Sequence, residues 1–459
     1  MSIRPTRLRR VVATATAVAL AGGLLSLATG QATAAAKPAK PAKYTDDFNG
    51  DGYRDYATSV TGQSVTLTYG TAAGPGGKTK EFDQRSPGIP GTLTGADGFS
   101  SAMAAADFNN DGYADLAVAD PTEKVGNRRG QGMVVVVWGT KSGLGSKATT
   151  LPLKSPRADM GFGRHLAAGD FDGNGKADLA VADDQSVHIY RGGFSSRNGG
   201  TGKVTRHTPN HDALLEITGL AAGKVTKDKA VDLYVLGAGY ANGRQNSGTW
   251  FLRGGSTVTA PKKPSTYNAA TPDYSPEGVV PDFDKDGYGD LAVNDTPYKK
   301  HAGSVLVLRG GKSGPGGSYR LTQGTAGVAT SLTAGDEFGF SLSAGDTNRD
   351  GYPDLAVSAM ETVGGLDAAG GVHVLRGGKK GLTGGGSQWF TRATAGVPGE
   401  PRETGMFGAF VRLRDADRDG DADLMISDNS ESTLVLKGGA SGITTGSASV
   451  VKLRANFPQ

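Results

Sequence analysis

The sequence predicts an all-β protein, a seven-bladed β-propeller whose blades are four-stranded antiparallel sheets. With 73 Gly among 459 residues and aromatic residues at only 7%, the chain has too many turns for a helical protein. A nine-residue acidic motif recurs along it, and a short apolar run typical of a buried strand follows each copy. One or two Gly residues then end a second apolar run in every repeat. Together these three observations predict many short strands in a repeating architecture.

The acidic motif is clearest at residues 282–290, where carboxylates stand at positions 1, 3, 5 and 9 and Gly287 stands at position 6. A tight loop needs a left-handed residue there, and glycine adopts that conformation without strain. The oxygens of positions 1, 3 and 5 can converge on one point, the carbonyl of position 7 can turn inward, and position 9 can close the shell. Calcium takes six to eight oxygen ligands at roughly 2.3–2.6 Å, so the spacing predicts a Ca²⁺ loop. An EF-hand closes at position 12, so closure at position 9 indicates a different scaffold.

Six copies of the motif carry the acids, and each is expected to use its backbone carbonyl at position 7. The candidate metal ligands, loop by loop, are Asp47, Asn49, Asp51, Tyr53 and Asp55; Asp107, Asn109, Asp111, Tyr113 and Asp115; Asp170, Asp172, Asn174, Lys176 and Asp178; Asp282, Asp284, Asp286, Tyr288 and Asp290; Asp346, Asn348, Asp350, Tyr352 and Asp354; and Asp415, Asp417, Asp419, Asp421 and Asp423. We therefore expect about six structural Ca²⁺ sites without a catalytic task. Two alternatives stay open: the acids could be solvated turns, or Mg²⁺ could bind, although it demands a tighter octahedral cage.

A further copy, the fourth in chain order, departs from the pattern. Aligned on its closing Asp232, it has Lys224 at position 1, Thr226 at position 3 and Asp228 at position 5. A lysine in the place of a carboxylate repels a cation. The strand pattern after the loop remains, so we expect this repeat to keep its fold without a metal.

The copies begin at residues 47, 107, 170, 224, 282, 346 and 415, so the period is 54–69 residues. An apolar run precedes most loops, and a more polar run follows the Gly residues. That makes four strands per repeat, with the acidic loop between the first and the second. Units of this kind cannot each bury a core alone, and seven of them arranged radially make a propeller.

At these residues the chain resembles the FG-GAP or VCBS repeat family, the seven-bladed propeller that heads integrin α chains, in a bacterial secreted form. Phe162-Gly163, Phe338-Gly339 and Phe407-Gly408 stand where the family's Phe-Gly stands, and the resemblance covers about residues 44–455. The first repeat lacks a Phe-Gly before its loop, and repeats two, four and five keep it only in part or not at all. By analogy with integrins, the resemblance implies ligand binding on the face away from the Ca²⁺ loops.

The first 36 residues are typical of a secretory signal peptide, because four arginines among residues 4–10 precede an uncharged run that extends to Ala36. An uncleaved signal anchor is the alternative, and Arg9-Arg10 leaves twin-arginine export open beside the Sec route. A Pro- and Lys-rich spacer (37–43) then leads into the propeller (44–459). We expect a secreted extracellular protein, free or associated with the cell wall, with no membrane span after signal cleavage.

The formal charge of +4 comes wholly from that leader, and without it 45 basic residues face 45 acidic ones. The charge therefore gives no support to a nucleic-acid partner. The chain has no Cys, so an exported form must draw its stability from its core and from metal. At about 1 mM Ca²⁺ and affinities of roughly 0.1–1 mM, each site adds about 0.4–1.4 kcal/mol, and six sites add about 2–8 kcal/mol.

Repeats two, four, five and six carry enlarged connections between their second and third strands, on the face opposite the acidic loops, where binding residues concentrate. Their polar and aromatic residues are Glu123, Lys124, Arg128, Arg129, Tyr240, Asn242, Arg244, Asn246, Tyr298, Lys299, Lys300, His301, Glu361 and Asp367. Basic groups beside tyrosines suit an anionic or hydroxyl-rich polymer; variable solvated loops are the alternative. We expect a monomeric binding or adhesion module for an extracellular glycan, cell-wall or protein ligand.

A secreted hydrolase with a site in the central channel is the alternative function, and a scaffold for protein partners is also open. No Gly-rich phosphate loop, no His-Glu-x-x-His motif and no Cys nucleophile is present. No recognisable nucleophile pattern accompanies the histidines, which are His165, His188, His207, His211, His301 and His373. We therefore identify no catalytic residue.

Overall fold

The computed structural model describes residues 42–458, apart from residues 61, 95–97, 146, 210–215, 242–243, 262–264, 269–275, 429 and 431. The predicted signal peptide and most of the predicted spacer lie outside these ranges. Ala39–Gln459 form one compact unit. Within the described ranges, no helix combines the length and the apolar character needed to cross a membrane.

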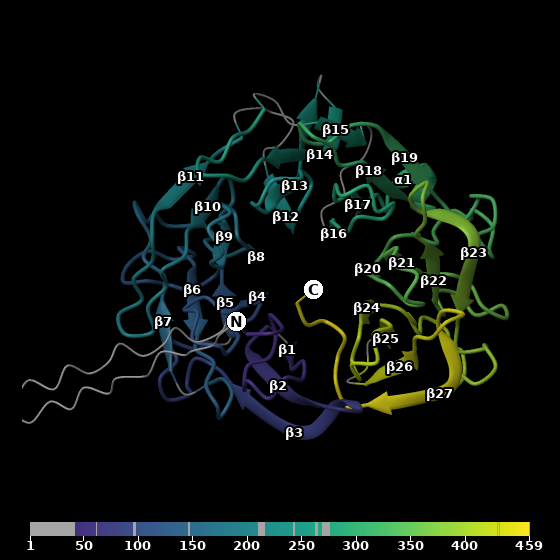
Figure 1. Cartoon of the computed structure of the whole chain (residues 1–459), viewed down its shortest axis with the longest axis horizontal. Coiled ribbons are helices and arrows are strands. Elements are labelled where there is room, and N and C mark those ends of the chain that lie inside the picture. The colour runs from purple at the N-terminus through teal and green to yellow at the C-terminus, as the bar shows by residue number, and fades with distance from the viewer. Residues whose placement is uncertain are drawn as a thin grey trace, which may run out of the picture. The chain divides into compact units, whose positions relative to one another are not determined.

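The compact unit consists of seven antiparallel sheets, or blades, that follow one another in chain order around a central opening (Figure 1). Blade by blade, the strands are β1 (Tyr56–Val60), β2 (Ser64–Thr71) and β3 (Gly74–Phe82); β4 (Ala102–Ala106), β5 (Asp115–Asp120), β6 (Met133–Val137) and β7 (Ala148–Thr150); β8 (His165–Gly169), β9 (Asp178–Ala182), β10 (Val187–Tyr190) and β11 (Val204–His207); β12 (Glu216–Gly223), β13 (Asp232–Ala241), β14 (Arg244–Leu252) and β15 (Ser265–Asn268); β16 (Gly278–Val279), β17 (Leu291–Asn294), β18 (Val305–Leu308) and β19 (Ser318–Leu321); β20 (Leu342–Gly345), β21 (Asp354–Ala359), β22 (Gly371–Arg376) and β23 (Thr383–Phe390); and β24 (Phe410–Arg414), β25 (Asp423–Ser427), β26 (Thr433–Lys437) and β27 (Thr444–Val451).

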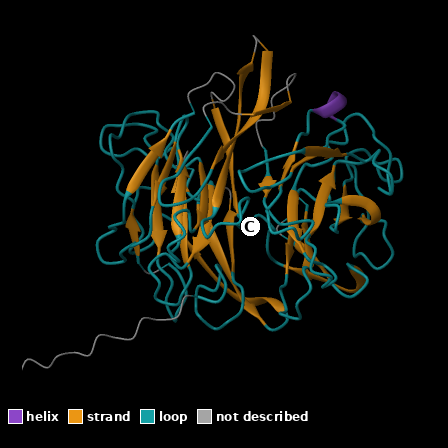
Figure 2. Cartoon of the chain, turned by 45° about the horizontal axis from the view of Figure 1, so that its top comes forward, coloured by secondary structure: helices purple, strands orange, loops and turns teal. Residues whose placement is uncertain are grey.

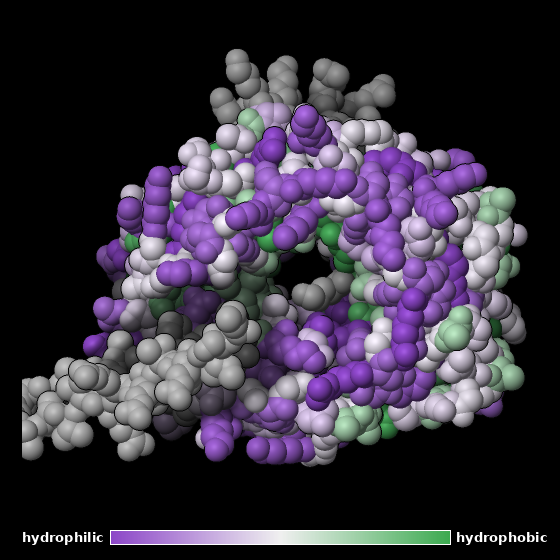
Figure 3. Space-filling model, in the orientation of Figure 1, coloured by the Kyte–Doolittle hydropathy of each residue, from purple (hydrophilic) through white to green (hydrophobic). Residues whose placement is uncertain are grey.

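This architecture confirms the predicted seven-bladed propeller. In blades 2 to 7 the acidic loop, or its altered fourth copy, joins the first strand to the second, as the repeat pattern predicts. The first strands of neighbouring blades, from β4 round to β24, contact one another. Figure 3 shows the opening through the ring.

Blade 1 differs from the prediction, because its described sheet has three strands and the loop at residues 47–55 leads directly into β1. The C-terminal residues run instead to the centre of the ring (Figure 1). There Asn456 Nδ2 donates a hydrogen bond to the carbonyl oxygen of Ser59 over 3.0 Å. The rings of Tyr56 and Phe457 pack edge to face, with centroids 5.2 Å apart. The end of the chain thus lies beside β1, where the other blades have their first strand, and connects blade 7 to blade 1.

Each hydrophobic core lies between two neighbouring blades. Alternate residues of one strand pack against the two neighbouring blades. Leu116 of β5 belongs to a cluster shared with blade 1, and Ala117 belongs to one shared with blade 3. Both β5 and β6 are buried throughout. A strand buried on both faces reads as a continuous apolar run, which explains why the sequence shows such runs rather than alternation.

The enlarged connections occur in the blades that the repeat spacing predicts. Two of them join β5 to β6 and β21 to β22. The connection between β17 and β18 contains the short element α1 (Tyr298–His301), and in blade 4 the paired strands β13 and β14 are longer. Figure 2 shows the β13–β14 hairpin and α1 projecting on the same side of the ring. Lys299, Lys300 and His301 have φ between 47° and 61°, so α1 is a left-handed turn.

Candidate metal centres

The closing aspartate of every repeat is buried and clamps its loop to the end of the third strand. One carboxylate oxygen accepts the N–H of the Gly that ends this strand, at 2.6–3.1 Å. The pairs are Asp55 with Gly70, Asp115 with Gly139, Asp178 with Gly192, Asp232 with Gly254, Asp290 with Gly310, Asp354 with Gly377 and Asp423 with Gly438. In six repeats the other oxygen accepts an N–H near the loop's start, as from Phe48 to Asp55 over 3.0 Å. A single side chain thus fixes the loop to two strands.

We number the loops 1 to 7 after their repeats. In loops 1, 2, 3, 5 and 6 backbone N–H groups bond to the side chain of position 1, and in all six acid-rich loops the side chain of position 5 accepts the N–H of position 7. In loop 5, Asp282 accepts the N–H groups of Asp286 and Gly287 at 3.1 and 2.8 Å, and Asp286 accepts that of Tyr288 at 2.9 Å. Positions 4 and 6 have positive φ in all six, for example 57° at Lys285 and 90° at Gly287. The left-handed glycine predicted at position 6 is confirmed, and position 4 is a second left-handed residue that the spacing did not reveal.

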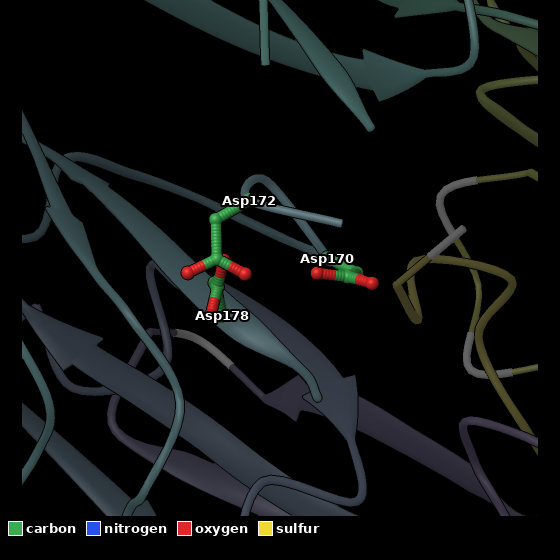
Figure 4. A group of neighbouring side chains, drawn as sticks. All are labelled: Asp170, Asp172 and Asp178. Carbon is green, nitrogen blue, oxygen red and sulfur yellow. The ribbon is translucent and has the colours of Figure 1, made fainter. Parts of the chain in front are cut away.

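Acidic side chains converge in loops 3, 5 and 7. Figure 4 shows Asp170, Asp172 and Asp178 of loop 3, each of which offers an oxygen within 4.8 Å of the others. Positions 1, 3 and 5 of loops 5 and 7 converge in the same way. In loops 1, 2 and 6 an asparagine takes position 3, and its side-chain oxygen accepts the position-5 N–H, as between Asn49 and Asp51 over 2.9 Å.

Position 7 of each acid-rich loop donates its N–H to the position-5 side chain. These residues are Tyr53, Tyr113, Lys176, Tyr288, Tyr352 and Asp421. This contact holds position 7 beside the converging oxygens. The inward turn of its carbonyl toward a cation remains a prediction.

The donor set fits a hard cation. Asp290 Oδ2 and Asp415 Oδ1 are buried oxygens without a hydrogen-bond partner among the described residues, and a cation supplies the positive charge that such atoms lack. Burial raises the pKa of Asp115 to about 8, that of Asp55 to about 7, and those of Asp178 and Asp290 to about 6. A Ca²⁺ ion favours the charged form of such groups, so its binding would oppose this protonation.

A basic side chain from the end of the third strand reaches into five loops, which the sequence analysis missed. The pairs are Arg191 with Asp172 (3.1 Å), Arg253 with Asp228 (3.1 Å), Arg309 with Asp284 (2.6 Å), Arg376 with Asp354 (2.9 Å) and Lys437 with Asp417 (3.0 Å). In loops 3, 5 and 7 the partner is the aspartate at position 3. Loops 1 and 2 have asparagine at position 3, and Tyr69 or Trp138 replaces the basic residue. Each aspartate at position 3 is thus paired with a basic residue, which limits repulsion among the carboxylates of loops 3, 5 and 7.

Loop 4 keeps the clamp but not the wrapped backbone. Asp232 accepts the N–H of Gly254 over 2.8 Å, while the N–H and the hydroxyl of Thr226 both donate to its other oxygen at 2.8 and 2.9 Å. Residues 224–232 are described throughout, and none of them has a positive φ. The four-stranded sheet β12–β15 confirms that this repeat keeps its fold, as predicted.

A polar cleft of about 840 Å³ lies between blades 2 and 3, among the connections opposite the acidic loops. Lys124 and Arg129 come from the β5–β6 connection, Asp159 and Arg164 precede β8, and Asp184 follows β9. Arg164 forms an ion pair with Asp184. Exposed groups of both charges therefore line the cleft.

Two acids that the sequence analysis placed among the surface groups are buried instead. Glu123 and Glu361 are 4% and 3% exposed. Each accepts a hydrogen bond from a glutamine at the end of the preceding blade, from Gln84 over 2.8 Å and from Gln323 over 2.9 Å. They join neighbouring blades, and Asn246 is buried as well. Asn242 and His211 lie outside the described residues, as do the side chains of Tyr240 and Arg244.

Three histidines have structural surroundings. His188 Nε2 lies 2.9 Å from an Asp183 oxygen, and His373 Nε2 lies 2.8 Å from a Glu361 oxygen, in two buried pairs. Burial lowers the pKa of His165 to about 4, so its ring is neutral at pH 7. These contacts account for the three side chains by packing and hydrogen bonding.

A family model for the FG-GAP repeat matches residues 99–137, 162–205 and 338–375, in blades 2, 3 and 6. The phosphatidylinositol-glycan-specific phospholipase D of Rattus norvegicus is 30% identical over 145 residues, 30% of this chain and 17% of that protein. Integrin alpha-PS5 of Drosophila melanogaster is 32% identical over 158 residues, 32% of this chain and 15% of that protein. The chain thus covers a small part of these relatives.

Among solved structures, one describes the recognition of non-reducing terminal N-acetylglucosamine by a lectin of Agrocybe aegerita. It aligns with 86% of this chain and 90% of its own chain, at a TM-score of 0.48 and 14% identity. At these values it gives no information about a ligand of this chain.

Proposed function

We propose, from the premise that this chain is a seven-bladed propeller of FG-GAP repeats, that it is a secreted, calcium-stabilised module that binds an extracellular ligand. One observation carries the proposal. The converging acids lie in the loops between first and second strands, whereas the cleft and the enlarged connections lie on the opposite face. A ring fixed by metal on one face leaves the connections of the other free to bind.

Calcium is proposed for the six acid-rich loops, with side-chain ligands at positions 1, 3, 5 and 9 and a carbonyl at position 7. When bound, it supplies positive charge to carboxylates that otherwise repel one another. The chain's own residues do the remaining work. The closing aspartate anchors the loop, and the left-handed residues at positions 4 and 6 turn it. In loops 3, 5 and 7 the basic residue of the third strand balances the position-3 acid.

The lining of the cleft favours a polar ligand. It carries Lys124, Arg129 and Asp159 at exposed positions and several threonines, and no aromatic side chain is among the described residues that line it. A chain rich in hydroxyl groups, or a peptide with charges of both signs, can hydrogen-bond to such a surface. A sugar ring that needs an aromatic stacking face finds none there. We propose an extracellular or cell-wall glycan, or a protein segment, as the ligand class.

The test is binding of the purified protein, in 1 mM Ca²⁺, to a glycan array, to isolated cell-wall polymers and to extracellular proteins. The names of the relatives suggest including a phosphatidylinositol glycan among the probes. We expect binding to one class, with the Kd raised at least tenfold, about 1.4 kcal/mol, in an Arg129→Ala/Arg164→Ala variant.

The matched control is a Lys141→Ala/Lys312→Ala variant, which removes two exposed basic residues from turns after the third strands of blades 2 and 5. It should bind as the unaltered protein does. Equal binding by the arginine variant would place the ligand elsewhere, and no binding to any probe would contradict the proposed ligand classes.

Secretion is tested separately. N-terminal sequencing of the exported protein should give a start just after Ala34 or Ala36, and fractionation should place the protein in the medium or on the cell wall. An intact N-terminus in the membrane fraction would instead establish the signal anchor.

A further inference from the structure

The loops contact one another around the ring through two fixed positions. The side chain at position 4 of one loop lies against position 7 of the next. From loop 4 to loop 5, Lys227 Nζ lies 4.3 Å from the centre of the Tyr288 ring. From loop 5 to loop 6, Lys285 Nζ lies 5.1 Å from the centre of the Tyr352 ring. From loop 7 to loop 1, Arg418 Cζ lies 4.7 Å from the centre of the Tyr53 ring.

Three more junctions use the same positions with different chemistry. From loop 6 to loop 7, Arg349 pairs with Asp421 at 2.9 Å and with Asp419 at 3.4 Å. From loop 1 to loop 2, position 4 is Gly50, and a Cβ there would lie 2.7 Å from the Tyr113 ring. From loop 3 to loop 4, a Cβ at Gly173 would lie 3.2 Å from the nitrogen of Ala230, so six of the seven junctions bring position 4 against position 7.

The glycine at position 6 leaves room for these contacts. A Cβ at Gly287 would collide with Lys227, and one at Gly351 would collide with Lys285. The glycine therefore has two roles, because it provides a left-handed turn within its own loop and space for the basic side chain of the preceding loop.

Main-chain bonds run between neighbouring loops as well. The position-8 N–H donates to the position-1 carbonyl of the preceding loop at four junctions. The pairs are Ala114 with Asp47 (2.9 Å), Val231 with Asp170 (2.8 Å), Gly289 with Lys224 (2.6 Å) and Ala422 with Asp346 (2.7 Å). Positions 1 and 4 of one loop are therefore tied to positions 7 and 8 of the next.

These are the positions that a bound cation fixes. Position 1 is a candidate ligand and position 7 offers the candidate carbonyl ligand. Position 4 has a left-handed backbone in the six acid-rich loops, which is strained where the residue is not glycine, as at Lys285 and Arg349. We infer that the loops form a coupled ring, in which Ca²⁺ bound in one loop strengthens binding in the next. Loop 4 takes part without an ion: Lys227 and the Lys224 carbonyl hold loop 5 in its binding conformation. This inference rests on the calcium sites of the proposed function.

Simple electrostatics gives the opposite sign, which makes the inference testable. Removing the ammonium group of Lys227 takes a positive charge away from the acids of loop 5, so Coulomb attraction alone would tighten Ca²⁺ there. Loss of the coupling predicts weaker binding instead. A cation–π contact at an exposed site corresponds to about a two- to fivefold change in affinity.

The experiment is calorimetric titration of the full chain, stripped with EGTA, with Ca²⁺ alone. Lys227→Ala should weaken one site about two- to fivefold, and Lys227→Arg, which keeps a cation over Tyr288, should restore it. Lys285→Ala should weaken the loop 6 site in the same way. Lys312→Ala, an exposed lysine of blade 5, is the control for the lost charge and should leave every site at least as tight.

A double mutant tests whether Lys227 acts through the loop 5 site. In an Asp282→Ala background, where loop 5 has lost its position-1 acid, Lys227→Ala should change none of the remaining sites. Unchanged or tighter binding in Lys227→Ala would overturn the coupled ring, whereas absence of Ca²⁺ uptake by the unaltered chain would overturn the proposed calcium sites themselves.

Discussion

Loops 4 and 5 are neighbours with the same clamp and different chemistry. In both, the closing aspartate accepts the N–H of the Gly after the third strand, at 2.8 Å for Asp232 and 2.9 Å for Asp290. In loop 4, Thr226 donates twice to the second oxygen of Asp232. In loop 5 the corresponding Asp290 Oδ2 is buried without a hydrogen-bond partner in the described part of the chain. Hydrogen bonds thus satisfy in loop 4 the oxygen that has no partner in loop 5.

The comparison separates two tasks within one motif. Position 9 builds the blade, because it joins loop to strand with or without other acids. Positions 1, 3 and 5, with the left-handed residues at 4 and 6, form the proposed ion site. Loop 4 shows that a repeat can lack the acids of positions 1 and 3 and still keep its four-stranded sheet.

Removal of calcium should have the largest effect, because it acts on six loops and spares loop 4. The free energy of unfolding should fall by about 2–8 kcal/mol between 1 mM Ca²⁺ and excess EGTA. Calorimetric unfolding, with metal content measured alongside, checks this. An unchanged melting temperature with no bound ion would mean that the loops are only acidic turns.

Loss of the clamp should rank second and should not depend on the ion. In EGTA, Asp232→Ala should lower the free energy of unfolding by about 2–4 kcal/mol and Asp290→Ala by about 1–3 kcal/mol. Asp232→Ala leaves the N–H groups of Gly254 and Thr226 without their acceptor, whereas Asp290→Ala leaves only that of Gly310. Urea denaturation measures both. If Asp232→Ala proved neutral, the closing aspartate would matter only through a bound ion.

Loss of a single ion should rank third. Asp282→Ala should remove one Ca²⁺ and about 0.4–1.4 kcal/mol of stability in 1 mM Ca²⁺. Lys224→Ala, at position 1 of loop 4, is the matched control and should leave the number of bound ions unchanged. An unchanged number of bound ions in Asp282→Ala would show that loop 5 binds none.

The smallest effect concerns pH in the absence of metal. Burial raises the pKa of Asp115 to about 8 and that of Asp55 to about 7, from an ordinary value of 3.8. Between pH 6.5 and 8 the folded state therefore binds more protons than the unfolded state, so the free energy of unfolding should fall as the pH rises. His165, whose pKa burial lowers, opposes this only below about pH 6.5. Melting temperatures in EGTA at pH 6.5 and 8 test whether stability falls as the pH rises. In 1 mM Ca²⁺ this fall in stability should disappear or change to a rise.

Much of the fold could be predicted because the motif is local. Nine consecutive residues contain the carboxylates, the glycine turn and the start of the buried strand. The basic partners of loops 3 to 7 were also visible, since Arg or Lys precedes the Gly pair in each. They were missed because the sequence pattern marks these residues only as the end of a strand. In the structure such a side chain contacts the acidic loop that precedes it in the chain, as Arg309 contacts Asp284, 25 residues earlier.

The sequence by itself determined the seven repeats, their four-strand pattern, the six acid-rich loops and the altered fourth loop, because each is written in contiguous residues. Only the tertiary structure decided what happens between blades. In the folded ring Glu123 and Glu361 are buried, and a cleft lies between blades 2 and 3. The C-terminal residues lie beside β1, and Lys285 contacts Asp350 of loop 6, 65 positions along the chain. The physical reason is that ring packing brings together residues one period apart, and local spacing carries no information about which side chains then meet.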